Sequence, residues 1–516
     1  MEFKENFPPA VISGILLALS FPKYGTGIVA WMALVPLLIS LNTGTLKSAL
    51  MAGLTTGFVF NVGIVYWIAS VVVNYGYLPP AVGLLAMLLL AAYLSLYVAL
   101  FAGGVVYLRD RRVSPVIAAP LLWTSLEYVK SHLLTGFPWE NLGYSQYLYI
   151  PFIQISDITG IYGITFVIVF INAIISDLAT VFVRGAGKGE KKRLIMEFLC
   201  GALLLVALWA YGSIRILQVE KELEKAPSLN VSLIQGNIDQ NIKWNPQYQN
   251  ETLEIYKSLS LSASPPRSGI IVWPETAAPF YFQEMDFMAR EVVKVAMTSG
   301  NWLLFGSPSY MRRQGVASFL NSAFLLSPEG KNAGRYDKVH LVPYGEYVPL
   351  RGLFPFISKL AAGVGDFKAG EGYHPLFLNN CKIGVLICYE GIFPEGSRTY
   401  RQQDADLLVN ITNDAWFGRS SAPYQHLSMT AFRAVENRLY LLRAANTGMS
   451  AIIDPTGKII SHTNLFAVAT LKGKVRFIDN RTFYMAYGDV FVYLCLIFLA
   501  LVILTSLKRR KKCWTN

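Results

Sequence analysis

Apolar residues concentrate toward the two ends of the chain, and their runs predict helices that span a membrane. The longest run, residues 48–108, contains no charged residue. A bilayer needs about 20 apolar residues for each helix, so this run can hold two spans, and Pro79 and Pro80 mark the turn between them. The pattern predicts about eight spans, with a bundle of seven helices in residues 1–216 and one more helix in 487–516. The shorter apolar runs are residues 8–22, 26–42, 113–131, 159–183, 194–216 and 490–507.

Basic residues flank these runs unevenly, and the asymmetry predicts the topology. The short loops on one side of the membrane hold only Lys23 and Lys130. Because loops rich in Lys and Arg stay in the cytoplasm, both termini are predicted to be cytoplasmic and residues 217–486 extracytoplasmic. The basic residues on the cytoplasmic side account for much of the net charge of +12, so this charge needs no nucleic-acid partner to explain it. The basic residues on that side are Lys4, Lys47, Arg109, Arg111, Arg112, Arg184, Lys188, Lys191, Lys192, Arg193, Lys508, Arg509, Arg510, Lys511 and Lys512.

The composition of the 516 residues is also typical of a membrane protein. Charged residues make up 15% and hydrophobic residues 53%, whereas an average soluble domain has about 25% charged residues. This balance excludes an ordinary cytosolic protein and a disordered chain. The five cysteines form no CxxC pair and the five histidines do not cluster at metal-ligand spacing. We therefore expect no disulfide framework and no metal site, and no cofactor.

Residues 228–475 have a different pattern, in which short apolar segments alternate with helical stretches such as 282–298 and 424–437. Apolar runs of four to eight residues between turn residues are typical of buried strands. The alternation predicts an α/β layered domain. The segments expected to form strands are 231–234, 269–273, 302–305, 323–326, 383–388, 407–409 and 439–442.

Three polar motifs lie at the ends of predicted strands or at turns, where the chemistry of such domains is commonly located. Glu275 follows a proline at the end of one strand, where partial desolvation raises the pKa of a carboxyl and suits it as a general base. Lys338 and Glu346 flank a turn that contains proline and glycine. Cys388 ends another strand, and a thiol needs a base or a positive field to react at neutral pH.

Each motif alone has an ordinary structural explanation. A cysteine at a strand end is more often a small buried apolar residue, and an Asp337–Lys338 pair can be a surface ion pair. Glu275 can simply begin a helix, where negative charge is favoured. Taken together, however, the motifs supply a base, a cation and a nucleophile, which are the groups that acyl transfer requires.

The order Glu, Lys, Cys resembles the catalytic triad of the nitrilase superfamily. With the predicted spans added, nearly the whole chain closely resembles the bacterial apolipoprotein N-acyltransferase family. The resemblance implies a nitrilase-like αββα sandwich on a transmembrane bundle, placed in the bacterial inner membrane with the sandwich in the periplasm. The segments that carry the resemblance are Leu233–Asn237, Trp273–Glu275, Tyr336–Lys338, Tyr347–Pro349, Cys388–Glu390 and Asn413–Phe417.

The resemblance also implies a role for each motif. Glu275 takes the proton of Cys388, which attacks an ester carbonyl of a membrane phospholipid and holds the acyl chain as a thioester. Lys338 and the backbone N–H of Tyr389 stabilise the oxyanion. Glu346 supports this group. The family positions near the substrate opening are Trp244, Tyr389 and Glu390.

The acceptor implied by the resemblance is the free α-amine of the N-terminal S-diacylglyceryl-cysteine of an apolipoprotein. The product is an amide, and the reaction is the last step of bacterial lipoprotein maturation. Transfer through a thioester has two steps, so the implied mechanism is of the ping-pong type.

The segment 350–365 is largely apolar and bears glycines, although it follows the Lys338 motif within the predicted soluble region. We expect it to form a mobile lid that dips into the membrane over the site, because exposed apolar surface marks membrane contact and Gly363 and Gly365 can act as hinges. The alternative is a buried helix of the domain core.

Three acidic residues, Glu127, Asp177 and Glu197, fall within the predicted spans. A charge at mid-bilayer is costly, but each of the three lies near a predicted helix end. We therefore expect these side chains to reach the headgroup interface.

Two other functions are compatible with part of the pattern. A membrane-tethered amidase or nitrilase uses the same triad with water as the second nucleophile, although a tether needs only one helix. A transporter with an appended domain places ionisable residues or broken helices in mid-span, and the charge-free run 48–108 offers little of either. The amidase is distinguished by whether a phospholipid or a small amide supplies the acyl group.

Overall fold

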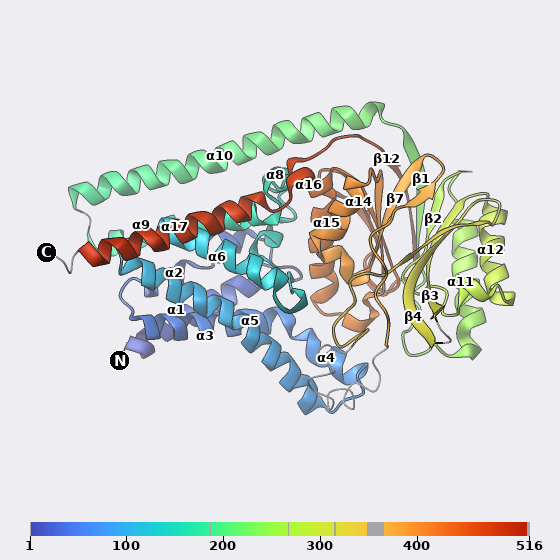
Figure 1. The fold of residues 1–516 in the computed structure, drawn as a ribbon, viewed down its shortest axis with the longest axis horizontal. Helices are drawn as coiled ribbons and strands as arrows, with labels where there is room; N and C mark the ends of the chain where they lie inside the picture. The colour runs from blue at the N-terminus through green and yellow to red at the C-terminus, as the bar shows by residue number, and fades with distance from the viewer. Residues whose placement is uncertain (1, 186, 267, 314–315, 348–365, 513–516) are drawn as a thin grey trace. The chain divides into compact units, whose positions relative to one another are not determined.

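The computed structural model describes residues 2–185, 187–266, 268–313, 316–347 and 366–512 (Figure 1). Within these ranges the chain divides into two compact units. The first unit is helical and comprises residues 1–70, 80–217 and 487–516. The second unit comprises residues 71–79 and 218–486. These limits lie next to the expected domain boundaries at 216/217 and 486/487.

Helices form on every apolar run of the first unit, which confirms the expected helical bundle. Among the described residues, five helices are long and apolar enough to cross a membrane. They are α3 (Leu46–Val65), α5 (Pro80–Arg109), α9 (Ile161–Arg184), α10 (Lys188–Lys225) and α17 (Val490–Lys512).

The remaining runs form shorter helices. Run 26–42 is divided into η1 (Ile28–Trp31) and α2 (Val35–Ser40), and α5 begins at Pro80, where the missing N–H of proline is tolerated. The other helices of this part of the chain are α1 (Glu2–Leu19), α4 (Trp67–Asn74), α6 (Pro115–His132), η2 (Leu133–Thr135), η3 (Leu142–Gln146), α7 (Ile150–Ile153) and α8 (Ser156–Thr159).

Glu127 of α6 is buried, so the expected interfacial position is wrong for this residue. Its Oε1 accepts hydrogen bonds from Trp123 Nε1 at 2.9 Å and from the backbone N–H of Leu142 at 2.6 Å. Its Oε2 accepts one from Thr165 Oγ1 at 2.8 Å. A buried carboxylate requires such donors, and here they connect α6 to the start of η3 and to α9.

The second unit contains two six-stranded mixed sheets within the described residues, with strand orders β12-β1-β2-β3-β4-β5 and β11-β10-β9-β8-β7-β6. Figure 1 shows α11 (Pro246–Ser262) and α12 (Phe287–Ser299) on the outer face of the first sheet, and α14 (Pro394–Gln402) and α15 (Ala422–Asn437) on that of the second. The strands are β1 (Ser228–Gln235), β2 (Ile270–Val272), β3 (Trp302–Arg313), β4 (Val316–Leu326), β5 (Asn332–Asp337), β6 (Leu376–Leu378), β7 (Cys381–Ile387), β8 (Leu407–Thr412), β9 (Tyr440–Ala445), β10 (Ala451–Ile453), β11 (Ile459–His462) and β12 (Ala469–Arg476).

The alternation of side chains along the central strands produces two apolar layers. Val231 and Leu233 of β1 pack in the core between the sheets, together with Val385 of β7. Ile234 and Ile271 face the other way and pack with residues of α11 and α12. The result is the αββα sandwich expected from the sequence.

The parallel pairs of the two sheets determine where polar residues gather. Strands β1, β2 and β3 are parallel neighbours, and so are β7, β8 and β9. The chain leaves β2 toward Glu275, β7 toward Cys388 and β8 toward Asn413. Within each sheet the carboxyl ends of the parallel strands share one edge. The hydrogen bond from the Asn413 N–H to Glu275 joins these edges of the two sheets, so the side chains of the candidate site gather between them.

Candidate active site

Glu275 lies in the turn that follows β2, close to the backbone of β3. Its Oε1 accepts a hydrogen bond from Asn321 Nδ2 at 2.7 Å, and its Oε2 accepts one from the backbone N–H of Asn413 at 3.0 Å. Gly306 makes the close approach possible, since a Cβ there would lie 2.8 Å from the Cα of Glu275. The carboxylate is therefore held from both sides in one orientation.

Burial sets the acid–base character of this carboxyl. Only 6% of Glu275 is exposed. Burial raises the pKa of Glu275, and the positive charge of Lys338 lowers it in part. A carboxyl with a raised pKa that remains close to a cation is suited to accept and return a proton near neutral pH.

Lys338 follows β5, and its buried ammonium group lies between two carboxylates. Its Nζ is 2.8 Å from Glu346 Oε2 and 3.9 Å from Glu275 Oε1. Burial by itself would lower the pKa of Lys338, but the charges of Glu346 and Glu275 outweigh burial and raise it. Lys338 is therefore a permanent cation at the site, as an oxyanion-stabilising group needs to be.

Glu346 and Asn321 complete the support of this cation. Asn321 Nδ2 donates to Glu346 Oε1 at 2.9 Å as well as to Glu275, and the backbone N–H of Val342 donates to Glu346 Oε2 at 2.8 Å. Asn321 lies in β4 and could not be identified as a site residue from the sequence, because it stands alone among the apolar and small residues of a strand. Only the pairing of β4 with β3 and β5 brings it to the site.

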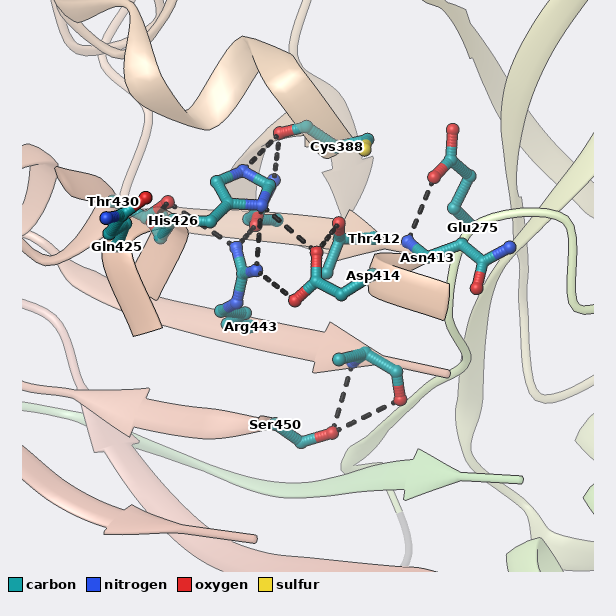
Figure 2. A network of polar contacts seen from close by, with 12 residues as sticks. Glu275, Cys388, Thr412, Asn413, Asp414, Gln425, His426, Thr430, Arg443 and Ser450 are labelled. Carbon is teal, nitrogen blue, oxygen red and sulfur yellow. Dashed lines mark hydrogen bonds and ion pairs between the residues drawn. The ribbon is translucent and has the colours of Figure 1, made fainter. Parts of the chain in front are cut away.

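Cys388 is the first residue after β7 and has a left-handed backbone, with φ of 54°. A non-glycine residue in this region is strained, and such strain is typical of a nucleophile at a sharp turn between a strand and a helix. Figure 2 shows its sulfur on the side of Glu275 and its carbonyl oxygen on the side of His426. Burial raises the pKa of the Cys388 thiol, Glu275 raises it further, and Lys338 lowers it.

Glu390 is buried within the domain, and its carboxylate connects the turn after β7 to the loop after β5. Oε1 accepts hydrogen bonds from Tyr336 Oη at 2.8 Å and from the backbone N–H groups of Val339 at 2.7 Å and His340 at 3.0 Å. Oε2 accepts one from the backbone N–H of Ile387 at 2.7 Å. Glu390 thus holds the segments of Cys388 and Lys338 together, which is a supporting position.

Trp244 and Tyr389 differ in exposure. The Trp244 side chain is 49% exposed, whereas Tyr389 is buried against Phe393 at a ring-centroid distance of 5.1 Å. Lys243, next to Trp244, was not singled out from the sequence, yet it is buried and its Nζ donates to the backbone carbonyl of Glu275 at 3.1 Å. Burial lowers the pKa of Lys243 to about 8, although Glu275 acts in the opposite direction.

A second polar cluster lies behind Cys388 and was also missed as a functional unit (Figure 2). It comprises Asn410 of β8, Asp414 of the turn after β8, His426 of α15 and Arg443 of β9. Arg443 Nη2 lies 2.8 Å from Asp414 Oδ2, and all four side chains are buried.

The segment 350–365, expected to form a lid, lies outside the described residues, so that expectation and its core-helix alternative both stay predictions.

Comparison with known proteins gives the relationship of the whole chain. Residues 13–174 match the family model described as apolipoprotein N-acyltransferase N-terminal domain, and residues 230–477 match the carbon-nitrogen hydrolase model. The chain is 47% identical over 508 residues to the apolipoprotein N-acyltransferase of Geobacter metallireducens, with 98% of this chain and 96% of that protein covered. The chain belongs to the apolipoprotein N-acyltransferase family. The resemblance expected from the sequence motifs is thereby confirmed.

More distant members of the apolipoprotein N-acyltransferase family match along most of their length as well. The protein of Pasteurella multocida is 34% identical, with 94% of this chain and 92% of that protein covered. Among solved structures, an amidase from Nesterenkonia sp. is similar to 51% of this chain and 95% of its own, at 19% identity and a TM-score of 0.38. The apolar helices and the family together make this chain a membrane protein.

Proposed function

We propose that this chain transfers an acyl chain from a membrane phospholipid, through a thioester on Cys388, to the N-terminal amine of a diacylglyceryl-modified apolipoprotein. Membership of the family makes it an acyltransferase that acts on apolipoproteins. The triad and the two-step course are supported by one observation in particular. The Lys338 ammonium lies between Glu275 and Glu346, and the charges of Lys338 and Glu275 act directly on the Cys388 thiol.

In the first step, Glu275 accepts the proton of the Cys388 thiol while the sulfur attacks the ester carbonyl carbon of the phospholipid. Lys338 and the backbone N–H of Tyr389 stabilise the tetrahedral oxyanion. The carbon–oxygen ester bond then breaks. The leaving lysophospholipid oxygen takes the proton back from Glu275, and the acyl chain remains on Cys388 as a thioester.

In the second step, the α-amine of the acceptor attacks the thioester carbonyl. Glu275 accepts a proton from the attacking nitrogen, and the same donors stabilise the second oxyanion. The carbon–sulfur bond breaks, an amide forms, and the Cys388 sulfur recovers its proton from Glu275. Both steps need a carboxylate that accepts and returns a proton, which is the property that burial and Lys338 give to Glu275.

Incubation with phospholipid alone tests the two-step course. The protein is expected to gain the mass of one acyl chain on Cys388 and to release one lysophospholipid, because the acceptor amine has no part in the first step. The bond should be cleaved by neutral hydroxylamine, as a thioester is, and a peptide with an N-terminal diacylglyceryl-cysteine should discharge it. Intact-protein mass spectrometry measures both events.

The competing mechanisms give different results in the same experiment. An amidase that uses water loses the acyl group rapidly without acceptor. A direct transfer from phospholipid to peptide gives no acyl-enzyme and no lysophospholipid until the peptide is added. Either result would contradict the proposed mechanism.

We also propose that the sandwich faces the periplasm and that both termini are cytoplasmic in the bacterial inner membrane. The distribution of basic residues around the apolar runs supports this orientation. A reporter fused after Asn516 is expected to give a cytoplasmic signal, and one inserted between Ser268 and Gly269 a periplasmic signal. A cytoplasmic signal from the internal insertion would contradict the orientation.

A further inference from the structure

The backbone carbonyl of Cys388 is held by two side chains from behind the site. Its oxygen accepts hydrogen bonds from Asn410 Nδ2 at 3.2 Å and from His426 Nε2 at 3.2 Å. These donors come from β8 and from α15, and His426 lies on the side of Cys388 away from Glu275 (Figure 2). The carbonyl of a strained left-handed residue is thus fixed in direction by two separate elements.

The direction of this carbonyl determines the direction of the next N–H. A trans peptide is planar, so its C=O and N–H point to opposite sides. Because the Cys388 carbonyl points toward His426, the N–H of Tyr389 points to the opposite side, where Figure 2 places the Cys388 sulfur. Within the part of the chain that the structure describes, this N–H donates to no hydrogen-bond acceptor. It is available to a reacting carbonyl oxygen.

The hydrogen positions of the cluster follow from the Cys388 carbonyl, which can only accept, and from Arg443, which can only donate. The Cys388 carbonyl lies 3.2 Å from His426 Nε2, so Nε2 carries the hydrogen that is donated to it. In the neutral ring Nδ1 then accepts from Arg443 Nη2 at 3.1 Å, although Asp414 Oδ1 also lies 3.1 Å from Nδ1. Burial and the charge of Arg443 lower the pKa of His426, although Asp414 acts in the opposite direction, and a lowered pKa favours the neutral ring at neutral pH. Arg443 Nη1 donates to Asn410 Oδ1 at 2.5 Å, so the amide Nδ2 faces the Cys388 carbonyl.

Asp414 balances the charge of this arrangement. Its Oδ2 pairs with Arg443 Nη2 at 2.8 Å, and its Oδ1 accepts from Thr412 Oγ1 at 3.1 Å. Burial would raise the pKa of Asp414, but Arg443 and His426 together outweigh burial and lower the pKa to about 2, so the carboxylate is ionised. A buried guanidinium needs such a partner, and the pair holds Arg443 against both His426 and Asn410.

We propose that His426 and Asn410, oriented by Arg443 and Asp414, are positioning residues that aim the Tyr389 N–H at the oxyanion. The inference rests on the proposed function, since it gives this N–H its place in the acyl-transfer step. His426 touches neither substrate nor sulfur in this role. It acts through the peptide that joins Cys388 to Tyr389.

Two reactions of the same thiol separate this role from general disruption of the site. Acylation by phospholipid passes through an oxyanion and needs the Tyr389 N–H, whereas alkylation by iodoacetamide needs only the thiolate. In the purified full-length protein, His426→Leu is expected to lower the rate of acyl-enzyme formation on the order of tenfold to a hundredfold, because one oriented donor is worth about that much or more. The alkylation rate of Cys388 is expected to change by less than about threefold, because alkylation passes through no oxyanion and does not use this donor.

Matched variants complete the test. His426→Gln places an amide N–H near the position of Nε2 and should recover acylation, whereas the shorter His426→Asn should not. The comparison of the Gln and Asn variants still tests the positioning role if His426→Leu does not fold. Ser428→Ala removes a buried hydroxyl from the same helix, which donates to Gln425 O at 2.8 Å, and should leave both rates unchanged.

The outcomes are distinct. An equal loss of acylation and alkylation in His426→Leu, or equal acylation in the Gln and Asn variants, would overturn the positioning role. If the unmodified protein forms no acyl-enzyme with phospholipid, the proposed function itself fails, independently of His426.

Discussion

Replacement of Cys388 by alanine is expected to abolish acyl transfer to a diacylglyceryl peptide. The thiol is the atom that forms the acyl-enzyme, so no residue in the site can take its place. Loss of a nucleophile that acts as part of a catalytic unit costs on the order of a millionfold in rate, which lies below detection for a membrane acyltransferase assay. The product peptide and the released lysophospholipid are both measured by mass spectrometry.

Cys381 provides the matched control for this variant. It lies at the start of the same strand, β7, is buried to a similar degree, and has no contact with Glu275 or Lys338. Cys381→Ala is expected to keep transfer within about twofold of the unmodified protein, since it removes one small buried group far from the reacting atoms. If Cys388→Ala still transfers the acyl chain to the peptide, or if Cys381→Ala no longer does, the nucleophile has been misassigned.

Replacement of Glu275 by glutamine is expected to lower both acyl-enzyme formation and thiol alkylation. General-base catalysis is worth about a hundredfold to ten-thousandfold, and here the base also determines whether the buried thiol ionises. Because burial raises the pKa of Cys388, the thiol without its base is protonated at neutral pH. The two rates are measured with phospholipid and with iodoacetamide on the same protein preparation.

The pH dependence of alkylation gives this prediction a second readout. At pH values below its pKa, a thiol without a base has a thiolate fraction that rises about tenfold with each pH unit. In Glu275→Gln the alkylation rate should therefore rise by about this factor per unit between about pH 7 and pH 9. The unmodified protein should respond less, because the proton passes to Glu275.

Glu346→Gln makes the same change of net charge on the other side of Lys338. It removes a supporting carboxylate and no proton acceptor of the thiol, so its effect on alkylation should be smaller than that of Glu275→Gln. A larger effect of Glu346→Gln would assign the base to Glu346 instead.

The sequence alone was sufficient for the fold class and for proposing the triad. Charge-free apolar runs predicted the helices because a bilayer demands length and hydrophobicity, which are local properties. The strands β1, β2, β7, β8 and β9 were predicted because their residues are buried on both faces and read as continuous apolar runs. Glu275, Lys338 and Cys388 could be recognised because each follows a strand or precedes a turn.

The outer strands were not recognisable in the same way. Strand β12 reads Ala-Thr-Leu-Lys-Gly-Lys-Val-Arg and is half exposed, so it carries no run of apolar residues. It forms because β1 offers an unpaired edge, and its register with β1 is antiparallel over the whole strand. Strands β5, β6, β10 and β11 are similarly short or polar, and pairing with a neighbour determines them.

Only the tertiary structure decided which polar residues surround the triad. Asn321 and Lys243 are remote from Glu275 in sequence. Asn321 reaches it because β4 pairs with β3, the neighbour of β2, and Lys243 reaches it from the turn before α11. The cluster of His426, Asn410 and Arg443 joins a helix and two strands behind one peptide group. A side chain's hydrogen-bond partners depend on packing between elements, which no local pattern of residues contains. The sequence indicated the proposed reacting groups of this protein, and the packing of its two sheets determined what orients them.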